Sequence, residues 1–277
     1  MGKIVGAWGV CHDPLITAIR ELAEPRQIEK VDAAFDELKK RVEKVSPDAL
    51  IVIGDDHFNT FFLDNMPAFC IGVAAGAKAP VEGWLRIPKY DVTYQQDLAK
   101  RILNDCVESE IDLSWSEELK MDHGIMLPLH FMTPHMKIPI VPLYINCQVH
   151  PMPTPKRCYE VGKKIREIVE AAPGNERIGV IGTGGLSHWV GTPETGKVNV
   201  DFDHRFLDGL LQGKDEELTR HTNAQIEEAG NGAHEIRNWL MMLGAAGEKR
   251  NPEVICYEPI PIWITGVGFV DMNVPMH

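Results

Sequence analysis

The chain has 277 residues, and its 28 Lys and Arg against 40 Asp and Glu give a formal net charge of −12. That charge excludes a general nucleic-acid binder, because such proteins need basic side chains to contact phosphates. The composition, 44% hydrophobic and 25% charged, is typical of a soluble globular protein and excludes a disordered or fibrous one.

The cysteines and the apolar runs indicate in which cellular compartment we expect the protein. The six cysteines include no CxxC pair, so neither a zinc finger nor a disulfide framework is indicated. Glycines punctuate the first residues too often for a signal peptide, and no apolar run reaches the roughly 18 residues of a membrane span. We therefore expect a cytoplasmic protein with no nucleic-acid or membrane partner.

Short apolar runs alternate with segments of helical period, a pattern typical of an α/β fold. The pattern predicts strands over residues 3–10, 49–55, 69–74, 138–145 and 177–181, and helices over 29–45, 95–107 and 155–172. Residues 80–90 are expected to form a loop, 191–247 a mostly helical segment, and 253–270 a last apolar segment. Without a repeat or a long linker, residues 1–277 are predicted to form a single catalytic domain, with a central mixed sheet flanked by helices.

Three histidines follow predicted strands at the point where each strand ends. His12 comes two residues after Val10, His57 three after Gly54, and His188 seven after Ile181. In an open α/β sheet this edge is where sites are built. Each histidine alone is more readily explained as an ordinary loop residue, but three at one edge favour a site. Two imidazoles and one carboxylate can hold iron and leave adjacent coordination positions open.

The spacing does not decide which carboxylate residue would complete such a triad. Asp13, Asp55 and Asp56 each stand close to a candidate histidine, and spacing alone favours Asp56. Glu235 is far away in sequence, near the start of a predicted helix. It has a strong structural interpretation there, because Asn231 is a good N-cap and an acidic first turn suits the helix dipole.

The segment GTGGLSHW over residues 182–189 lacks the full GxGxxG spacing, so a dinucleotide site is not indicated. Its glycines can let the backbone approach a ligand closely, which leaves His188 either a third metal ligand or a free acid/base. His123 precedes an apolar stretch; reaching the same pocket and simply starting a helix are equally good interpretations. We treat the remaining histidines as structural or solvated: His130, His135, His150, His204, His221, His234 and His277.

Five blocks stand out in order along the chain: VCHDPL around His12, DDHFNTFFLDNMPAFCIGV around His57, MDHGIMLPL around His123, GTGGLSH around His188 and NGAHEIRNWL around Glu235. In this order they resemble the class III (LigB-type) extradiol ring-cleavage dioxygenases, and the resemblance covers most of the chain. It implies a non-haem Fe(II) enzyme that opens a catechol-type ring with O2 and gives a muconic semialdehyde-type product.

The resemblance also implies roles for individual residues. His12, His57 and Glu235 match the family's iron ligands, which overrules the preference for Asp56. His188 matches the catalytic acid/base, and His123 matches a second active-site histidine that contacts substrate or oxygen. Three ligands on one face of Fe(II) leave the opposite face for both catechol oxygens and O2. A histidine suits proton transfer because its pKa lies close to neutrality.

Substrate and partners are less sharply indicated. CYEVGKKIRE and FDHRFLDGLL resemble the protocatechuate 4,5-dioxygenase branch, whereas YEPIPIWITGVGF resembles the 2,3-dihydroxyphenylpropionate branch. Trp263 stands where the protocatechuate branch has a small polar residue, and Cys11 replaces a serine that often precedes the first ligand. Gallate, a methylated gallate, an aminophenol or a hydroxypyridone are alternative substrates, and a non-catalytic metal-binding relative is an alternative class. The resemblance implies either a homo-oligomer or pairing with a separate small helical subunit.

Overall fold

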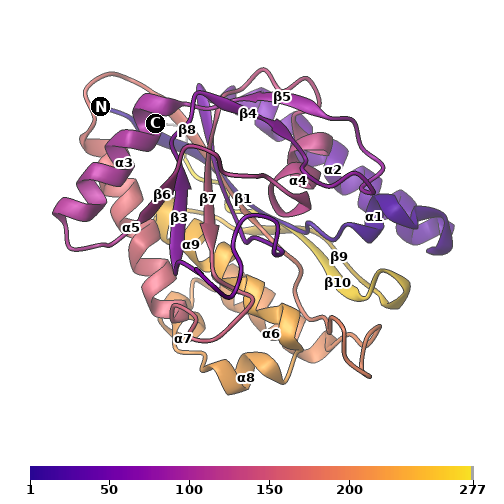
Figure 1. Ribbon diagram of the computed structural model, residues 1–277. Coiled ribbons are helices and arrows are strands. Elements are labelled where there is room, and N and C mark those ends of the chain that lie inside the picture. The colour runs from indigo at the N-terminus through magenta and orange to yellow at the C-terminus, as the bar shows by residue number, and fades with distance from the viewer. Residues whose placement is uncertain (276–277) are drawn as a thin grey trace.

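An eight-stranded mixed sheet runs through the middle of the protein (Figure 1), in a computed structural model that describes residues 1–275. His277, treated above as structural or solvated, lies outside the described residues. From edge to edge the strands are β6 (Ser114–Ser116), β3 (Phe69–Gly72), β7 (Ile140–Ile145), β2 (Ala49–Gly54), β8 (Arg177–Thr183), β1 (Lys3–Val10), β10 (Thr265–Asp271) and β9 (Glu253–Ile260). Strands β7, β2, β8 and β1 are parallel, whereas β3, β10 and β9 add antiparallel pairs. The predicted fold class is therefore confirmed.

The four parallel strands are buried on both faces, as continuous apolar runs require. Helices α2 (Pro25–Val45) and α4 (His123–Met132) contribute to one core, and α3 (Gln96–Glu108), α5 (Pro155–Ala171) and α9 (Ile236–Ala246) to the other. Helix α2 begins four residues before the predicted start, because Pro25 occupies its first turn and needs no hydrogen-bond partner for a backbone N–H.

Helix α9 is enclosed on every side, and all eleven of its residues are buried. It packs directly against α5 through two glycines. A Cβ atom at Gly162 would lie 2.0 Å from the carbonyl oxygen of Met241, and one at Gly244 would lie 2.2 Å from that of Tyr159. This close approach fixes the position of α9, and Glu235 directly precedes its first residue.

The late segment is mostly helical, as predicted, and before α9 the structure divides it into short pieces: α6 (Val200–Leu211), α7 (Asp215–Thr219), α8 (Asn223–Glu227) and the 3₁₀ turn η2 (Asn231–Glu235). Three further turns are α1 (Leu15–Ala18), η1 (Arg20–Leu22) and η3 (Pro261–Trp263). The sequence did not predict the hairpin of β4 (Gly76–Ala79) and β5 (Tyr90–Thr93), which brackets the expected loop.

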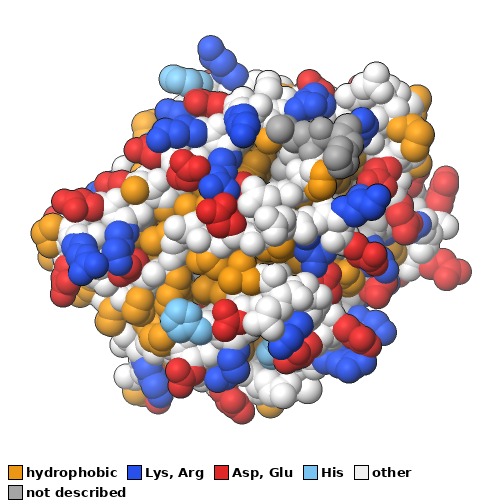
Figure 2. Space-filling model, turned by 180° about the vertical axis from the view of Figure 1, so that it is seen from behind, with side chains coloured by type: hydrophobic (Ala, Val, Ile, Leu, Met, Phe, Trp, Pro, Cys, Tyr) orange, Lys and Arg blue, Asp and Glu red, His pale blue; other side chains and the backbone are white. Residues whose placement is uncertain are grey.

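The surface matches the mixed charge of the sequence. On the face that Figure 2 shows, acidic and basic side chains are interspersed among apolar ones. Among the described residues, no helix is long and apolar enough to cross a membrane.

Candidate metal centre

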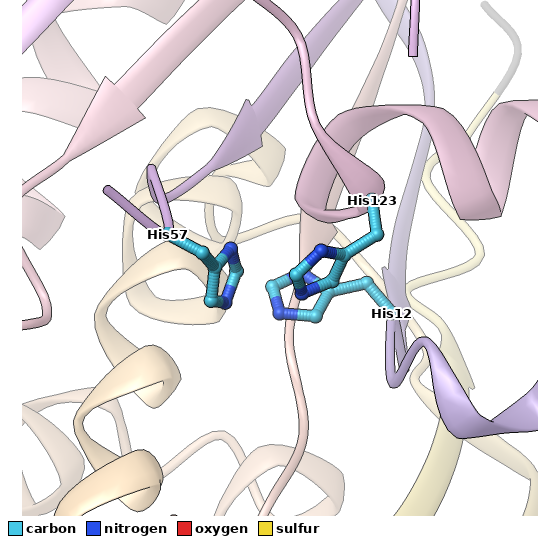
Figure 3. A group of neighbouring side chains, drawn as sticks. All are labelled: His12, His57 and His123. Atoms are coloured by element: carbon cyan, nitrogen blue, oxygen red, sulfur yellow. The ribbon is translucent and has the colours of Figure 1, made fainter. Parts of the chain in front are cut away.

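His12 and His57 come together just beyond the ends of two parallel strands. His12 follows β1 and His57 follows β2, and both strands pair with β8. The two imidazole rings stand edge to face with their centroids 5.1 Å apart. Figure 3 shows these rings and that of His123 pointing toward a common space from three different segments.

Glu235 reaches the same space from η2. Its Oε2 lies 3.2 Å from His12 Nε2, and its Oε1 lies 3.5 Å from His57 Nε2. The backbone N–H of Gly185 donates to Oε2 at 2.7 Å. Gly184 has a φ of +137°, and a Cβ atom there would lie 2.8 Å from the Cβ of Glu235. The glycines after β8 therefore let the loop close over the glutamate.

Hydrogen bonds fix which nitrogen of His12 carries the proton. The Thr183 hydroxyl donates to the carbonyl oxygen of Gly124 at 2.6 Å, so it accepts from His12 Nδ1, 3.0 Å away. Nε2 of His12 is then left with its lone pair, and this buried atom has no hydrogen-bond partner. Such an orphaned acceptor facing a carboxylate is what a bound cation would satisfy.

His57 is oriented in the same way by Asp122. Its Nδ1 lies 3.1 Å from Asp122 Oδ2, and a carboxylate can only accept, so Nε2 of His57 keeps its lone pair. Asp122 also accepts from the backbone N–H of His57 at 2.8 Å. Burial opposes ionisation of Asp122, but His57 outweighs it and holds the pKa of this carboxyl well below its usual range.

Asp55 is a fourth potential ligand that the sequence left among its alternatives. Ligand atoms of His12, Asp55, His57 and Glu235 all lie within 4.8 Å of one another. Both oxygens of Asp55 accept amide hydrogen bonds, from Asn238 Nδ2 at 2.8 Å and from Gln148 Nε2 at 2.6 Å. Each oxygen of Asp55 therefore already accepts one hydrogen bond from the protein, whereas the Glu235 carboxylate faces both histidines.

The spacing-based preference for Asp56 is wrong. Its carboxylate is not among the close ligand atoms and accepts backbone N–H groups of Asn59, Thr60 and Phe61, which organises the loop after β2. Burial raises the pKa of Asp56 to about 6. Successive residues after a strand point to opposite sides, so only one of the two aspartates can face the site.

The donor set fits a divalent cation. It offers two neutral imidazole nitrogens and the Glu235 carboxylate, and Asp55 and Asp122 add buried negative charge around them. Burial disfavours ionisation of Glu235, but His12 and His188, when protonated, hold its pKa well below the usual value, and a bound cation would take the place of the His12 proton. The glutamate is therefore anionic and ready to bind a cation.

His188 lies beside this group, and outside the four potential ligands. Its Nδ1 donates to the carbonyl oxygen of Leu186 at 3.1 Å, and its Nε2 lies 3.5 Å from Glu235 Oε1. A Cβ atom at Gly232 would lie 2.0 Å from that Nε2, so the glycine makes room for the ring. Burial lowers the affinity of the ring for a proton, but the Glu235 carboxylate outweighs it and raises the pKa of His188 to about 9.

His123 is the first residue of α4, so the sequence was right that it starts a helix, and its ring also faces the site. The His57 and His123 centroids are 3.9 Å apart. Nδ1 of His123 lies 2.6 Å from Glu82 Oε1, and the backbone N–H of His123 donates to the other oxygen of Glu82. The remaining Nε2 is an unprotonated acceptor, because burial and then His57 lower the pKa of this ring.

A cavity of about 170 Å³ opens onto these side chains. Its walls are His12, Asp13, Pro14, Leu15, His57, His123, Gln148, Gly185, His188, Val190, Asn231, Gly232, Glu235, Ile264 and Thr265. A cavity of roughly 150 Å³ can hold benzene, so this one accommodates a single aromatic ring with small substituents. None of the described residues that line it is Lys or Arg.

A second group of two histidines and a glutamate has different chemistry. Nε2 of His150 and Nε2 of His234 lie 3.1 and 3.4 Å from Glu227 Oε1. Arg237 donates to His234 Nδ1 at 2.7 Å, and because arginine only donates, the proton of His234 must be on Nε2. That nitrogen then donates to Glu227 and has no lone pair for a metal. The structural role predicted for His150 and His234 agrees with this arrangement.

Several residues that hold the site in place were not predicted from the sequence. Glu82 lies in an expected loop, and Gln148 and Asn238 approach Asp55 only through tertiary packing. Asp122 is the N-cap of α4, and an Asp before a helix start could have been read from the sequence.

The N-cap proposed for Asn231 is wrong. Gly230 occupies that position in η2, and Asn231 instead pairs with the backbone of Val190 in both directions. Glu235 ends η2 and is the N-cap residue of α9, so it does lie at a helix start, but its side chain makes no capping hydrogen bond.

The fold and the donor set together define an α/β protein with a candidate metal centre at the carboxyl edge of its sheet. Residues 6–268 match the family described as the catalytic LigB subunit of aromatic ring-opening dioxygenase, and the chain belongs to this family. It is therefore a ring-opening dioxygenase, an oxidoreductase, and the resemblance to class III extradiol dioxygenases noted from the sequence is confirmed.

Two relatives carry the name 2,3-dihydroxyphenylpropionate/2,3-dihydroxicinnamic acid 1,2-dioxygenase. The protein from Klebsiella pneumoniae subsp. pneumoniae is 28% identical over 93% of this chain and 95% of its own. The protein from Escherichia coli O139:H28 is also 28% identical, over the same shares. The crystal structure of the uncharacterized protein JW3007 from Escherichia coli K12 has a TM-score of 0.56 and 16% identity, covering 86% of this chain and 92% of that one, which supports the fold alone.

Proposed function

We propose that the protein is a non-haem Fe(II) enzyme that cleaves the ring of a catechol beside its two hydroxyls, using O2, and forms a muconic semialdehyde-type product. One observation carries the proposal: two imidazole nitrogens with free lone pairs and one glutamate meet at the wall of a cavity that fits one aromatic ring. The names of the two relatives, both ring-cleaving dioxygenases, support it.

His12, His57 and Glu235 would hold the iron. When bound there, Fe(II) would supply open coordination positions at which the catechol oxygens and O2 are brought together. The protein's part is to keep both imidazoles in the right tautomer, through Thr183 and Asp122.

His188 and His123 act on the substrate in this proposal. A cation held by Glu235 would offset the carboxylate charge that raises the pKa of His188, so that Nε2 of His188 accepts a proton from a catechol hydroxyl as the substrate binds and later returns it to the reacting oxygen. Nε2 of His123 is held toward the cavity by the bond from Nδ1 to Glu82, so it accepts from the second hydroxyl or contacts oxygen. Enclosure of both rings keeps these protons from exchanging freely with water.

Several expectations from the sequence remain predictions. We propose that residues 1–277 act as one catalytic domain in a cytoplasmic enzyme of aromatic catabolism, as a homo-oligomer or with a separate small helical subunit. Gallate, methylgallate, an aminophenol or a hydroxypyridone would use the same metal site. A non-catalytic metal-binding relative is the alternative from another class.

Oxygen uptake tests the proposal directly. Protein reconstituted anaerobically with Fe(II) is mixed with catechol, protocatechuate, gallate, dihydroxyphenylpropionate or an aminophenol, with Zn(II)-loaded protein as the control. We expect stoichiometric oxygen consumption and a yellow ring-opened product with at least one substrate, only in the iron form. Binding of metal without oxygen uptake across the whole panel would instead support the non-catalytic relative.

A further inference from the structure

Two polar atoms on the wall of the cavity have no partner in the protein. They are Oδ2 of Asp13 and Oγ1 of Thr265, and both side chains line the cavity beside the candidate metal ligands. Asp13 is 6% exposed and Thr265 is 1% exposed. Because buried polar groups without a hydrogen bond cost free energy, a bound molecule that satisfies both atoms is favoured.

The local structure explains why one oxygen of Asp13 is used and the other is free. Oδ1 accepts from the backbone N–H of Leu15 at 2.7 Å, where the chain turns into α1. The intervening Pro14 has a φ of −66°, which holds this turn. Oδ2 is thereby fixed at the cavity wall with no hydrogen-bond donor of the described protein beside it.

Thr265 is held from the other side of the cavity. It begins β10 and pairs with His188 in an isolated β-bridge. Its hydroxyl is turned toward Gly185, where a Cβ atom would lie only 2.6 Å away. The absence of a side chain at Gly185 therefore makes room for this buried hydroxyl beside the cavity, near the proposed acid/base.

The charge of the wall favours one class of substituent. Asp13 and Glu235 are acidic, and no described residue that lines the cavity is Lys or Arg. A carboxylate on the substrate ring would find no Lys or Arg to pair with, and it would meet an acceptor at ionised Asp13. A hydroxyl or amino group can donate to Asp13, and Thr265 can donate to or accept from the same kinds of group.

The geometry points to a substrate preference: Asp13 and Thr265 select catechols whose ring carries a hydrogen-bond-donating substituent, such as a hydroxyl, hydroxymethyl or aminomethyl group, over catechols that carry a carboxylate there. This inference rests on the proposed ring cleavage and names the substrate class. It separates the protein from its two relatives, whose names specify aromatic acids. The cavity volume limits the substituent to a small one.

Matched pairs of catechols test the preference. 4-(Hydroxymethyl)catechol is compared with 3,4-dihydroxybenzoate, and 3-(hydroxymethyl)catechol with 2,3-dihydroxybenzoate. Dissociation constants are measured without oxygen on the iron-loaded protein, and kcat/KM values in air. In at least one pair we expect the alcohol to be favoured by about 10-fold or more in both measurements.

Two variants assign that ratio to the two side chains. Asp13→Asn keeps an oxygen for Leu15 N–H and places an NH2 group where Oδ2 was, so the alcohol-to-carboxylate ratio should fall about 10-fold or invert. Thr265→Val keeps the side-chain volume and removes the hydroxyl, and it should weaken binding of the favoured alcohol about 3- to 10-fold. Asp208→Asn, an exposed substitution on α6 with the same change of charge, should leave the ratio unchanged.

The outcomes separate this inference from the proposed function. A wild-type preference for the carboxylate in both pairs would overturn it, as would an Asp13→Asn effect equal for all catechols. If the alcohols bind preferentially without oxygen but are not cleaved in air, ring cleavage fails while the preference stands. Circular dichroism and iron content check the variants, and Thr265→Val decides the question if Asp13→Asn does not fold.

Discussion

Two groups of two histidines and one glutamate meet at η2, which supplies Glu235 to one and His234 to the other. In the first group, the Nδ1–H groups of His12 and His57 donate hydrogen bonds to oxygen acceptors, so each Nε2 keeps its lone pair. In the second, Arg237 donates to His234 Nδ1 and forces the proton onto Nε2. The same residue types therefore form a candidate metal centre or a hydrogen-bonded link, according to the partner behind the ring.

The largest effect should come from removing a ligand of the first group. Glu235→Ala or His12→Ala deletes one of three donors, so we expect loss of stoichiometric iron and of all ring cleavage. Metal analysis after desalting measures this. Glu227→Ala removes the corresponding glutamate of the second group and should leave the iron content unchanged. Iron retained at wild-type stoichiometry by both ligand variants would refute the assignment of the first group.

The next effect should separate His188 from the ligands beside it. His188→Ala removes the proposed proton acceptor and no donor of the metal, so we expect full iron content and kcat lowered about 10²- to 10⁴-fold. Iron analysis and single-turnover kinetics are measured on the same sample. Loss of iron in this variant would show that His188 is a ligand and that the two-histidine arrangement is incomplete.

The second group, His150, Glu227 and His234, should affect the stability of the protein and not its metal content. Burial, together with Arg237, lowers the pKa of His234 from 6.5 to about 4. The folded protein thus resists protonation, so the stabilising effect of the neutral ring is complete above pH 6.5 and is lost as the pH falls toward 4. The loss amounts to at most about 3 kcal/mol in the free energy of unfolding.

Urea unfolding of the wild type and of His234→Gln between pH 7 and pH 4 measures that loss. The variant has no imidazole at this position, so the stability difference between the two proteins should shrink as the pH decreases. Parallel stability curves over the whole range would mean that His234 does not resist protonation in the folded protein.

The sequence predicted the sheet and the meeting of histidines at its edge because both depend on local pattern. Parallel buried strands are read from apolar runs, and their carboxyl ends must lie at one edge. The hairpin of β4 and β5 was missed because its strands are short and partly exposed, with little hydrophobic alternation.

The carboxylate could not be predicted from spacing. Asp56 directly precedes His57 in the chain, yet its carboxylate accepts hydrogen bonds from the loop after β2. Glu235 instead lies at the start of α9, which packs against α5 through Gly162 and Gly244. That packing brings together residues far apart in the chain, and no local pattern encodes it. Family resemblance named Glu235, and the structure supplies the physical reason why it can reach the histidines.

The smallest effect should come from weakening the partner behind a ligand. Asp122→Asn replaces the charged acceptor of His57 Nδ1 with a neutral one of the same shape, so the tautomer is favoured less strongly. We expect iron affinity to fall about 10- to 100-fold, because partners of ligating histidines typically have effects of this size. Competition with a chelator measures the affinity, and exposed Asp208→Asn is the matched control for the change of charge. An unchanged affinity in Asp122→Asn would mean that ring orientation does not distinguish the two groups, and that the nearby carboxylate charge of Asp55 and Glu235 alone selects the first group for metal.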